Sequence, residues 1–256
     1  MKKKILIISG DPNSINSEII IKSWKKIKTS LRKRIYLISN IDLIKKQSKI
    51  LKIPIQLLKV KNLNEKPEID KLKIINLGLK FKKPFKIKKI FSSKFILKSL
   101  DLAHEMALDD RKVSGIINCA ITKELLRRKK IGVTEYLASK CNLKNNSEVM
   151  LILNNKLSVS PLTTHINIKE VSKKINKNIL IIKVKTIHKW FRKFYKKKPK
   201  IGVLGLNPHN AELRKNSEEV RIIAPTISKL KKLGFNIQGP LVSDTIFVND
   251  YKNYDV

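Results

Sequence analysis

The chain has 256 residues, which is enough for one large domain or two ordinary ones, and its 42% hydrophobic content is typical of a globular protein. Its 57 Lys and Arg against 20 Asp and Glu give a net charge of +37, but the basic residues recur along the whole sequence. That spread favours a lysine-rich surface with only non-specific attraction to nucleic acid. Two cysteines without CxxC spacing exclude a disulfide framework, and no apolar run is long enough to span a membrane, so we expect a cytoplasmic protein.

Short apolar runs alternate with segments of helical period in the first half of the chain. Residues 4–9, 34–39, 73–78 and 113–120 are predicted strands. Between the last two, "SSKFILKSLDLAHEMALDD" repeats apolar residues at helical spacing, with Ser92 or Ser93 as a candidate N-cap. This alternation predicts α/β architecture, with a mainly parallel sheet covered by helices on both faces.

The second half repeats the same alternation. Strands are predicted at residues 148–153, 157–164 and 200–206, and helices at residues 167–175, 178–195 and 216–234. In the last helix Asn216 and Glu219 have capping-box spacing, Pro225 predicts a kink or a helix start, and Gly234 predicts the end. We divide the chain into a first α/β domain, residues 1–125, and a second, residues 126–256.

Two of the four histidines follow predicted strands. His165 lies in "PLTTHIN" and His209 in "GLNPHN", and the carboxyl ends of parallel strands converge on one edge of a sheet. Imidazole is a common metal ligand, so a shared metal ion is one interpretation, although two histidines do not complete a ligand set. His104 and His188 lie within predicted helices, where a surface or boundary role is the simpler interpretation.

Thr134 follows the strand at residues 113–120, where it could bind a substrate hydroxyl or phosphate, or cap a helix. The sequence contains no GxxxxGK[ST] phosphate loop, GxGxxG, GxSxG or HExxH motif. The common nucleotide-binding, serine-hydrolase and zinc-protease signatures are therefore excluded.

Taken together, six stretches resemble the 4-hydroxythreonine-4-phosphate dehydrogenase family of vitamin B6 biosynthesis. They occur in family order along nearly the whole chain, and they read "IISGDPNSINSEI", "INCAITKELL", "IGVTEYLA", "LTTHINIKEV", "VLGLNPHNAE" and "GPLVSDTIF". The resemblance implies a homodimer of two α/β/α domains, similar to isocitrate and isopropylmalate dehydrogenases.

The resemblance also implies a site and a reaction. NAD or NADP would accept a hydride, and His165 and His209 would hold a divalent metal ion such as zinc, magnesium or cobalt. Thr134 would bind the substrate, 4-phosphohydroxy-L-threonine, and Asp244 would act as a supporting or acid/base residue. The oxidised product, a 2-amino-3-oxo acid phosphate, would lose carbon dioxide to give 3-amino-2-oxopropyl phosphate.

This sequence also departs from the family pattern. Val133 replaces a substrate-binding histidine, and Ser14 and Asn16 replace glycines in the opening turn. The sequence ends at Val256, before the family's third metal histidine, so we expect an incomplete second domain. Two alternatives to an active dehydrogenase stay open: an inactive remnant of the enzyme, and a basic nucleic-acid-binding protein on the same fold.

Overall fold

The computed structural model divides the chain into two compact units, Met1–Cys141 and Asn142–Val256. The predicted domain boundary between residues 125 and 126 lies outside the described residues and stays a prediction. The residues that the structure describes are 3–65, 68–109, 113–122, 124, 132–141, 143, 147–164, 166–248 and 250–256.

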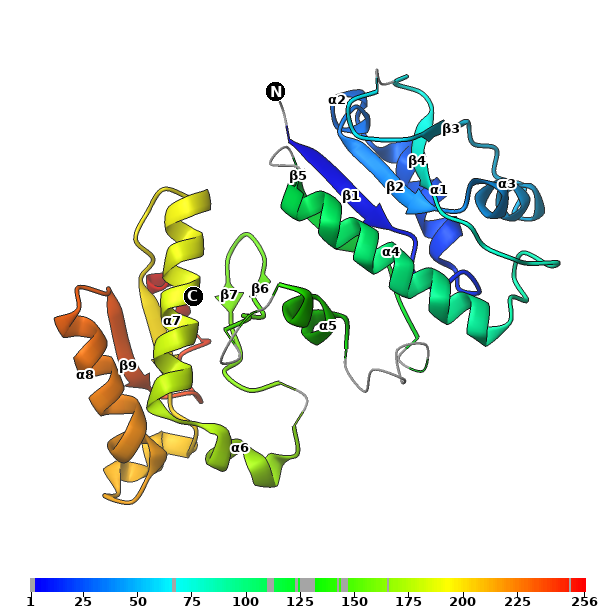
Figure 1. The fold of residues 1–256 in the computed structure, drawn as a ribbon. Coiled ribbons are helices and arrows are strands. Elements are labelled where there is room, and N and C mark those ends of the chain that lie inside the picture. The colour runs from blue at the N-terminus through cyan, green and yellow to red at the C-terminus, as the bar shows by residue number, and fades with distance from the viewer. Residues whose placement is uncertain are drawn as a thin grey trace. The chain divides into compact units, whose positions relative to one another are not determined.

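The first unit contains a five-stranded parallel sheet in the order β3-β4-β2-β1-β5 (Figure 1). Its strands are β1 (Lys4–Ile8), β2 (Ile35–Ser39), β3 (Leu57–Val60), β4 (Leu72–Asn76) and β5 (Val113–Asn118). Its helices are α1 (Asn16–Lys26), α2 (Thr29–Arg32), α3 (Ile41–Ile50), α4 (Lys89–Asp109) and α5 (Val133–Lys140). The parallel sheet and the strands beginning near residues 4, 34, 73 and 113 confirm the prediction from alternating apolar runs.

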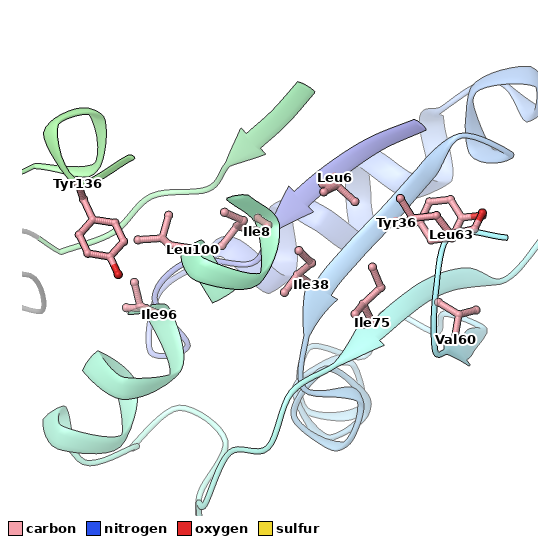
Figure 2. Packing of buried hydrophobic residues seen from close by; sticks show 11 residues of the cluster. Leu6, Ile8, Tyr36, Ile38, Val60, Leu63, Ile75, Ile96, Leu100 and Tyr136 are labelled. Atoms are coloured by element: carbon pink, nitrogen blue, oxygen red, sulfur yellow. The ribbon is translucent and has the colours of Figure 1, made fainter. Parts of the chain in front are cut away.

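Alternate residues of the central strands enter two different cores. Leu6 of β1 and Tyr36 of β2 belong to a core that also contains Ile96 and Leu100 of α4, and Figure 2 shows Tyr36 beside Leu63 in this cluster. The sequence neighbours of Tyr36, Ile35 and Leu37, point the other way and belong to a second core with Trp24 of α1. Because every residue of β2 is buried, helices must cover both faces of the sheet, which gives the three-layer α/β/α arrangement.

The second unit has two small sheets. Its strands β8 (Ile201–Leu204) and β9 (Ile237–Leu241) are parallel, and β6 (Ile152–Leu153) pairs antiparallel with β7 (Ser158–Val159). Its helices are α6 (Ile168–Lys174), α7 (Lys177–Phe194) and α8 (Ala224–Lys232), and a π-helical turn at Glu219–Ile223 precedes α8. The buried sides of α7, α8, β8 and β9 form one hydrophobic core.

Several boundaries differ from the prediction. Neither Ser92 nor Ser93 caps α4, because the helix begins at Lys89 and Ser92 lies fully buried within it. The strands predicted at residues 148–153 and 157–164 shorten to two-residue β6 and β7. Ile152 and Leu153 are more than half exposed, so burial of apolar side chains contributes little to holding a longer strand there.

Pro225 lies in the first turn of α8, as its fixed φ predicts. It has no N–H to donate to the carbonyl of Arg221, four residues earlier, and the backbone just before it is π-helical. Gly234, at φ +82°, follows the end of α8 as predicted. No helix among the described residues is long and apolar enough to cross a membrane.

Lys73 of β4 is a charged residue inside the first unit, with no exposed surface. Its Nζ donates a hydrogen bond to the Arg32 carbonyl at 2.8 Å and lies 4.7 Å from the centre of the Tyr36 ring. Burial, and then repulsion from Lys4, lower the pKa of Lys73 to about 8. As the pH rises, the folded state therefore releases the Lys73 proton at a lower pH than the unfolded chain does.

We predict that the free energy of unfolding rises by about 1–3 kcal/mol between about pH 8 and pH 10, where the unfolded chain holds more protons. Urea denaturation at a series of pH values measures this rise. The Lys73→Met variant should lose most of it, because the titrating amine is gone. An equally steep rise in this variant would show that another group is responsible.

Candidate functional site

The predicted site residues that the structure describes are divided between the two units. His209 follows β8 and Asp244 follows β9, so both lie at the carboxyl edge of the same two parallel strands. Asp244 Oδ2 accepts a hydrogen bond from the backbone N–H of His209 at 3.2 Å. Thr134 belongs to the other unit, and His165 lies outside the described residues.

The loop that carries His209 has an unusual backbone. His209, Asn210, Ala211 and Glu212 all have φ near +50° and ψ near +30°, and Leu213 has φ +58°. A left-handed conformation costs roughly 1–2 kcal/mol for each residue other than glycine. Strain of this kind persists only where surrounding contacts enforce it, and it concentrates at functional sites.

The carboxylate of Glu219 supplies the main contacts. It is fully buried and accepts hydrogen bonds from the backbone N–H groups of Leu206 and Asn207, each at 2.8 Å. The Asn207 side chain donates to it at 3.0 Å. Burial raises the pKa of Glu219, but the bonds from Asn207 and Leu206 outweigh it, so the pKa lies below its ordinary value.

Two further contacts hold the loop from its other side. Asn210 Nδ2 donates to the Pro240 carbonyl of β9 at 3.1 Å. Gly205 lies against the same side chain: a Cβ at position 205 would lie 2.1 Å from Asn210 Oδ1, so a larger residue there would displace the amide. The start of the loop and its left-handed turn are thus fixed to neighbouring segments of the same unit.

The side chain of His209 is exposed, while its backbone is held in place. An accessible imidazole on a rigid loop suits metal ligation, and a carboxylate fixed against the same backbone suits a supporting residue. In the described part of the chain, no three His, Cys, Asp or Glu side chains gather as a complete metal site. His209 therefore fits as one ligand, with other donors required.

In the first unit the opening turn after β1 is closed by polar side chains. Gly10 has φ +70°, and a Cβ there would lie 2.5 Å from the Ala120 carbonyl. Asn16 Nδ2 donates to the carbonyls of Ser9 and Ala120 at 3.0 and 2.7 Å. The left-handed position of this turn is therefore occupied by a glycine, Gly10. The buried side chain of Asn16 joins the segments that follow β1 and β5.

Thr134 lies in the first turn of α5 with its side chain exposed. Its neighbour Val133 packs against the hydrophobic core that α4 covers. Tyr136 anchors α5 to α4 by donating to Asp101 at 2.6 Å. Among the described residues no side chain caps the start of α5, and the exposed side chain of Thr134 is accessible to a ligand.

Comparison with known proteins gives consistent matches. Residues 31–256 match the family model described as PdxA, pyridoxal phosphate biosynthetic protein. The 4-hydroxythreonine-4-phosphate dehydrogenase of Sulfurihydrogenibium sp. (strain YO3AOP1) is 33% identical, over 99% of this chain and 78% of its own length. The enzyme of the same name from Aquifex aeolicus is also 33% identical, over 97% of this chain and 77% of its length.

A solved structure from Klebsiella pneumoniae, titled as a 4-hydroxythreonine-4-phosphate dehydrogenase, matches with a TM-score of 0.87. It is 24% identical and covers 99% of this chain and 80% of its own. At that identity the match shows a shared fold.

Sequence reasoning missed the role of Glu219. The predicted capping box of Asn216 and Glu219 is wrong. The carboxylate of Glu219 instead accepts the N–H of Leu206 in the loop after β8. The Val220 N–H donates to Ser217 Oγ and not to Asn216. One available signal was the acidic pair Glu218 and Glu219 in a chain that has few acidic residues.

We predict that Glu219→Ala lowers the free energy of unfolding of the second unit by about 2–4 kcal/mol, because the backbone N–H groups of Leu206 and Asn207 lose their buried acceptor. Urea denaturation measures the loss. Glu170→Ala is the matched control: this half-exposed carboxylate on α6 pairs with Lys173, and its loss should change the free energy of unfolding by less than about 0.5 kcal/mol. Equal effects of the two substitutions would contradict the assigned role of Glu219.

Proposed function

The chain belongs to the family of PdxA pyridoxal phosphate biosynthetic proteins, and from that premise we propose that it oxidises 4-phosphohydroxy-L-threonine. The observation that carries the proposal is the strained loop after β8. The motif "VLGLNPHNAE", which resembles the family pattern, contains this loop. The loop is held in the strained left-handed conformation, and it exposes the imidazole of His209 after the end of β8.

The proposed chemistry is the oxidation of a secondary alcohol. The carbon that bears the hydroxyl transfers a hydride to NAD or NADP, the hydroxyl proton leaves to a base, and a ketone forms. The resulting 2-amino-3-oxo acid phosphate then loses carbon dioxide and becomes 3-amino-2-oxopropyl phosphate. A bound divalent ion, zinc, magnesium or cobalt, would supply Lewis acidity at the substrate oxygen.

The residues take the following roles in this proposal. His165 and His209 would hold the metal ion, and Thr134 would donate or accept a hydrogen bond at the substrate. We assign Asp244 a positioning role, because its carboxylate already accepts the backbone N–H of His209. We also propose a homodimer, which the family resemblance implies, and a cytoplasmic location, which the free Cys119 and Cys141 support.

A catalytically inactive member of the family is the second candidate. Val133 favours it, because valine offers no donor or acceptor beside Thr134, where the family resemblance implies a substrate-binding histidine. The two candidates differ in one measurable property, which is turnover of the phosphorylated substrate.

We predict NADH or NADPH formation from 4-phosphohydroxy-L-threonine, lost on treatment with EDTA and restored by a divalent metal. His209→Ala should lower kcat/KM by more than the roughly 10–100-fold that loss of a supporting residue costs. Absorbance at the reduced nicotinamide band measures the rate. The control is His104→Ala, on α4, which should leave the rate unchanged.

Two results would count against parts of this proposal. Turnover that survives both His165→Ala and His209→Ala would contradict the metal assignment. No turnover with either cofactor and any of the three metals would contradict the activity itself and support the inactive member.

A further inference from the structure

The end of α7 carries an unusual surface made of cations and aromatic rings. Seven consecutive side chains are exposed there, and we call them the basic aromatic surface: Arg192, Lys193, Phe194, Tyr195, Lys196, Lys197 and Lys198. Phe194 and Tyr195 are 50% and 51% exposed, although aromatic residues usually bury most of their area. The surface lies within the second unit and shares no residue with the candidate site.

The rings are held in fixed positions. The ring centres of Trp190 and Phe194 lie 5.2 Å apart, and those of Trp190 and Tyr195 lie 5.3 Å apart. Tyr195 also packs on Phe191, which anchors it to the core at 5.2 Å. Two half-exposed rings are thus preorganised on a support of two less exposed ones, which reduces the entropy lost when a ligand stacks on them.

The charge of the surface is largely uncompensated. The sequence has no acidic residue between Glu170 and Glu212. Lys197 pairs with Asp255 at 2.5 Å, and the described part of the chain shows no acidic partner for the other four cations. A ligand with several negative charges would therefore meet cations that are free to bind it.

A hollow of about 280 Å³ adjoins this surface. Its lining includes Asn155, Lys156, Trp190, Tyr195 and Tyr254, together with Lys197 and the carboxylate of Asp255 that pairs with it. A cavity of roughly 150 Å³ accommodates a benzene ring, so this hollow has room for a nucleobase. Aromatic rings, an amide and ammonium groups around one hollow match the faces, edges and phosphate of a nucleotide unit.

We propose that the basic aromatic surface binds single-stranded nucleic acid. The cations would contact the phosphates, and Phe194 and Tyr195 would stack on unpaired bases, which every sequence offers. Duplex nucleic acid keeps its bases stacked inside the helix and would lack this second contribution. The overall charge of +37 accounts for weak attraction to any polyanion, while the exposed rings add the preference for single strands.

An anionic membrane would also attract cations and aromatic rings, but the fold disfavours it. Insertion of an amphipathic helix requires an accessible apolar face. The apolar face of α7, formed by Leu180, Val184, Ile187 and Phe191, is buried in the core of the second unit. Phe194 and Tyr195 alone remain on the exposed side near its end.

The test is fluorescence anisotropy of the full chain with labelled oligo(dT) and oligo(U) of about twelve nucleotides, at about 150 mM salt. Phe194→Ala with Tyr195→Ala changes no charge and should weaken binding by about tenfold or more. Binding to duplex DNA should change by less than about twofold. The single substitution Phe194→Ala is a milder second variant, and thermal unfolding by circular dichroism verifies the fold of each protein.

A matched pair of charge variants separates this surface from the net charge. One replaces the five cations of the basic aromatic surface with Gln, and the control replaces five exposed lysines of the first unit with Gln: Lys25, Lys26, Lys28, Lys45 and Lys49. The first variant should reduce the slope of log Kd against log salt by about 2–3, and the control by less than about 1.

Three outcomes would overturn the proposal. If the two charge variants lose single-strand binding and salt dependence equally, the binding is explained by net charge alone. Unchanged single-strand binding after loss of the rings would remove the stacking role. Tighter binding to vesicles of phosphatidylglycerol than to oligonucleotides, reduced by the same ring substitutions, would assign the surface to a membrane.

Discussion

A single buried carboxylate determines the shape of the candidate site. Glu219 satisfies the N–H groups of Leu206 and Asn207 just after β8 and so fixes the chain where it enters the left-handed turn. Charge-assisted hydrogen bonds contribute about 1.5–3 kcal/mol each, the same order as the strain of the individual left-handed residues. Without this acceptor the loop loses its main support, although Asn210 still contacts Pro240 and Asp244 still accepts the His209 N–H. We therefore expect His209 to be less well fixed.

The first unit also fixes a loop after a strand, here with the buried amide of Asn16 and the carboxylate of Asp11. After β1, the left-handed position is Gly10, and the amide of Asn16 joins the carbonyls of Ser9 and Ala120. Thr122 adds a bond of 2.6 Å to Asp11, which ties the opening turn to the segment after β5. In both units a partly buried strand ends in a loop whose backbone is fixed by a buried polar side chain, a suitable base for a ligand site.

The parts of the fold that local patterns determine could be predicted from the sequence. Apolar runs located β1, β2, β4, β5 and β8. Pro225 predicted a kink or a helix start and lies in the first turn of α8, and Gly234 predicted the end of this helix. The strand-end argument placed His209 at the edge where Asp244 also lies. The role of Glu219 depends on a contact between residues twelve and thirteen positions apart, so its spacing suggested a helix cap instead. The half-exposed rings of Phe194 and Tyr195 likewise depend on how α7 packs, which periodicity alone does not determine.

The family membership and the geometry of the loop converge on one central claim, that His209 is a metal ligand on a loop held by Glu219. Anomalous X-ray diffraction at the zinc edge, from crystals grown with zinc, tests it most directly. If His209 is a metal ligand, the anomalous peak marks a zinc ion within bonding distance of the imidazoles of both His209 and His165. A His209 ring that faces solvent, with zinc bound elsewhere or absent, would contradict it.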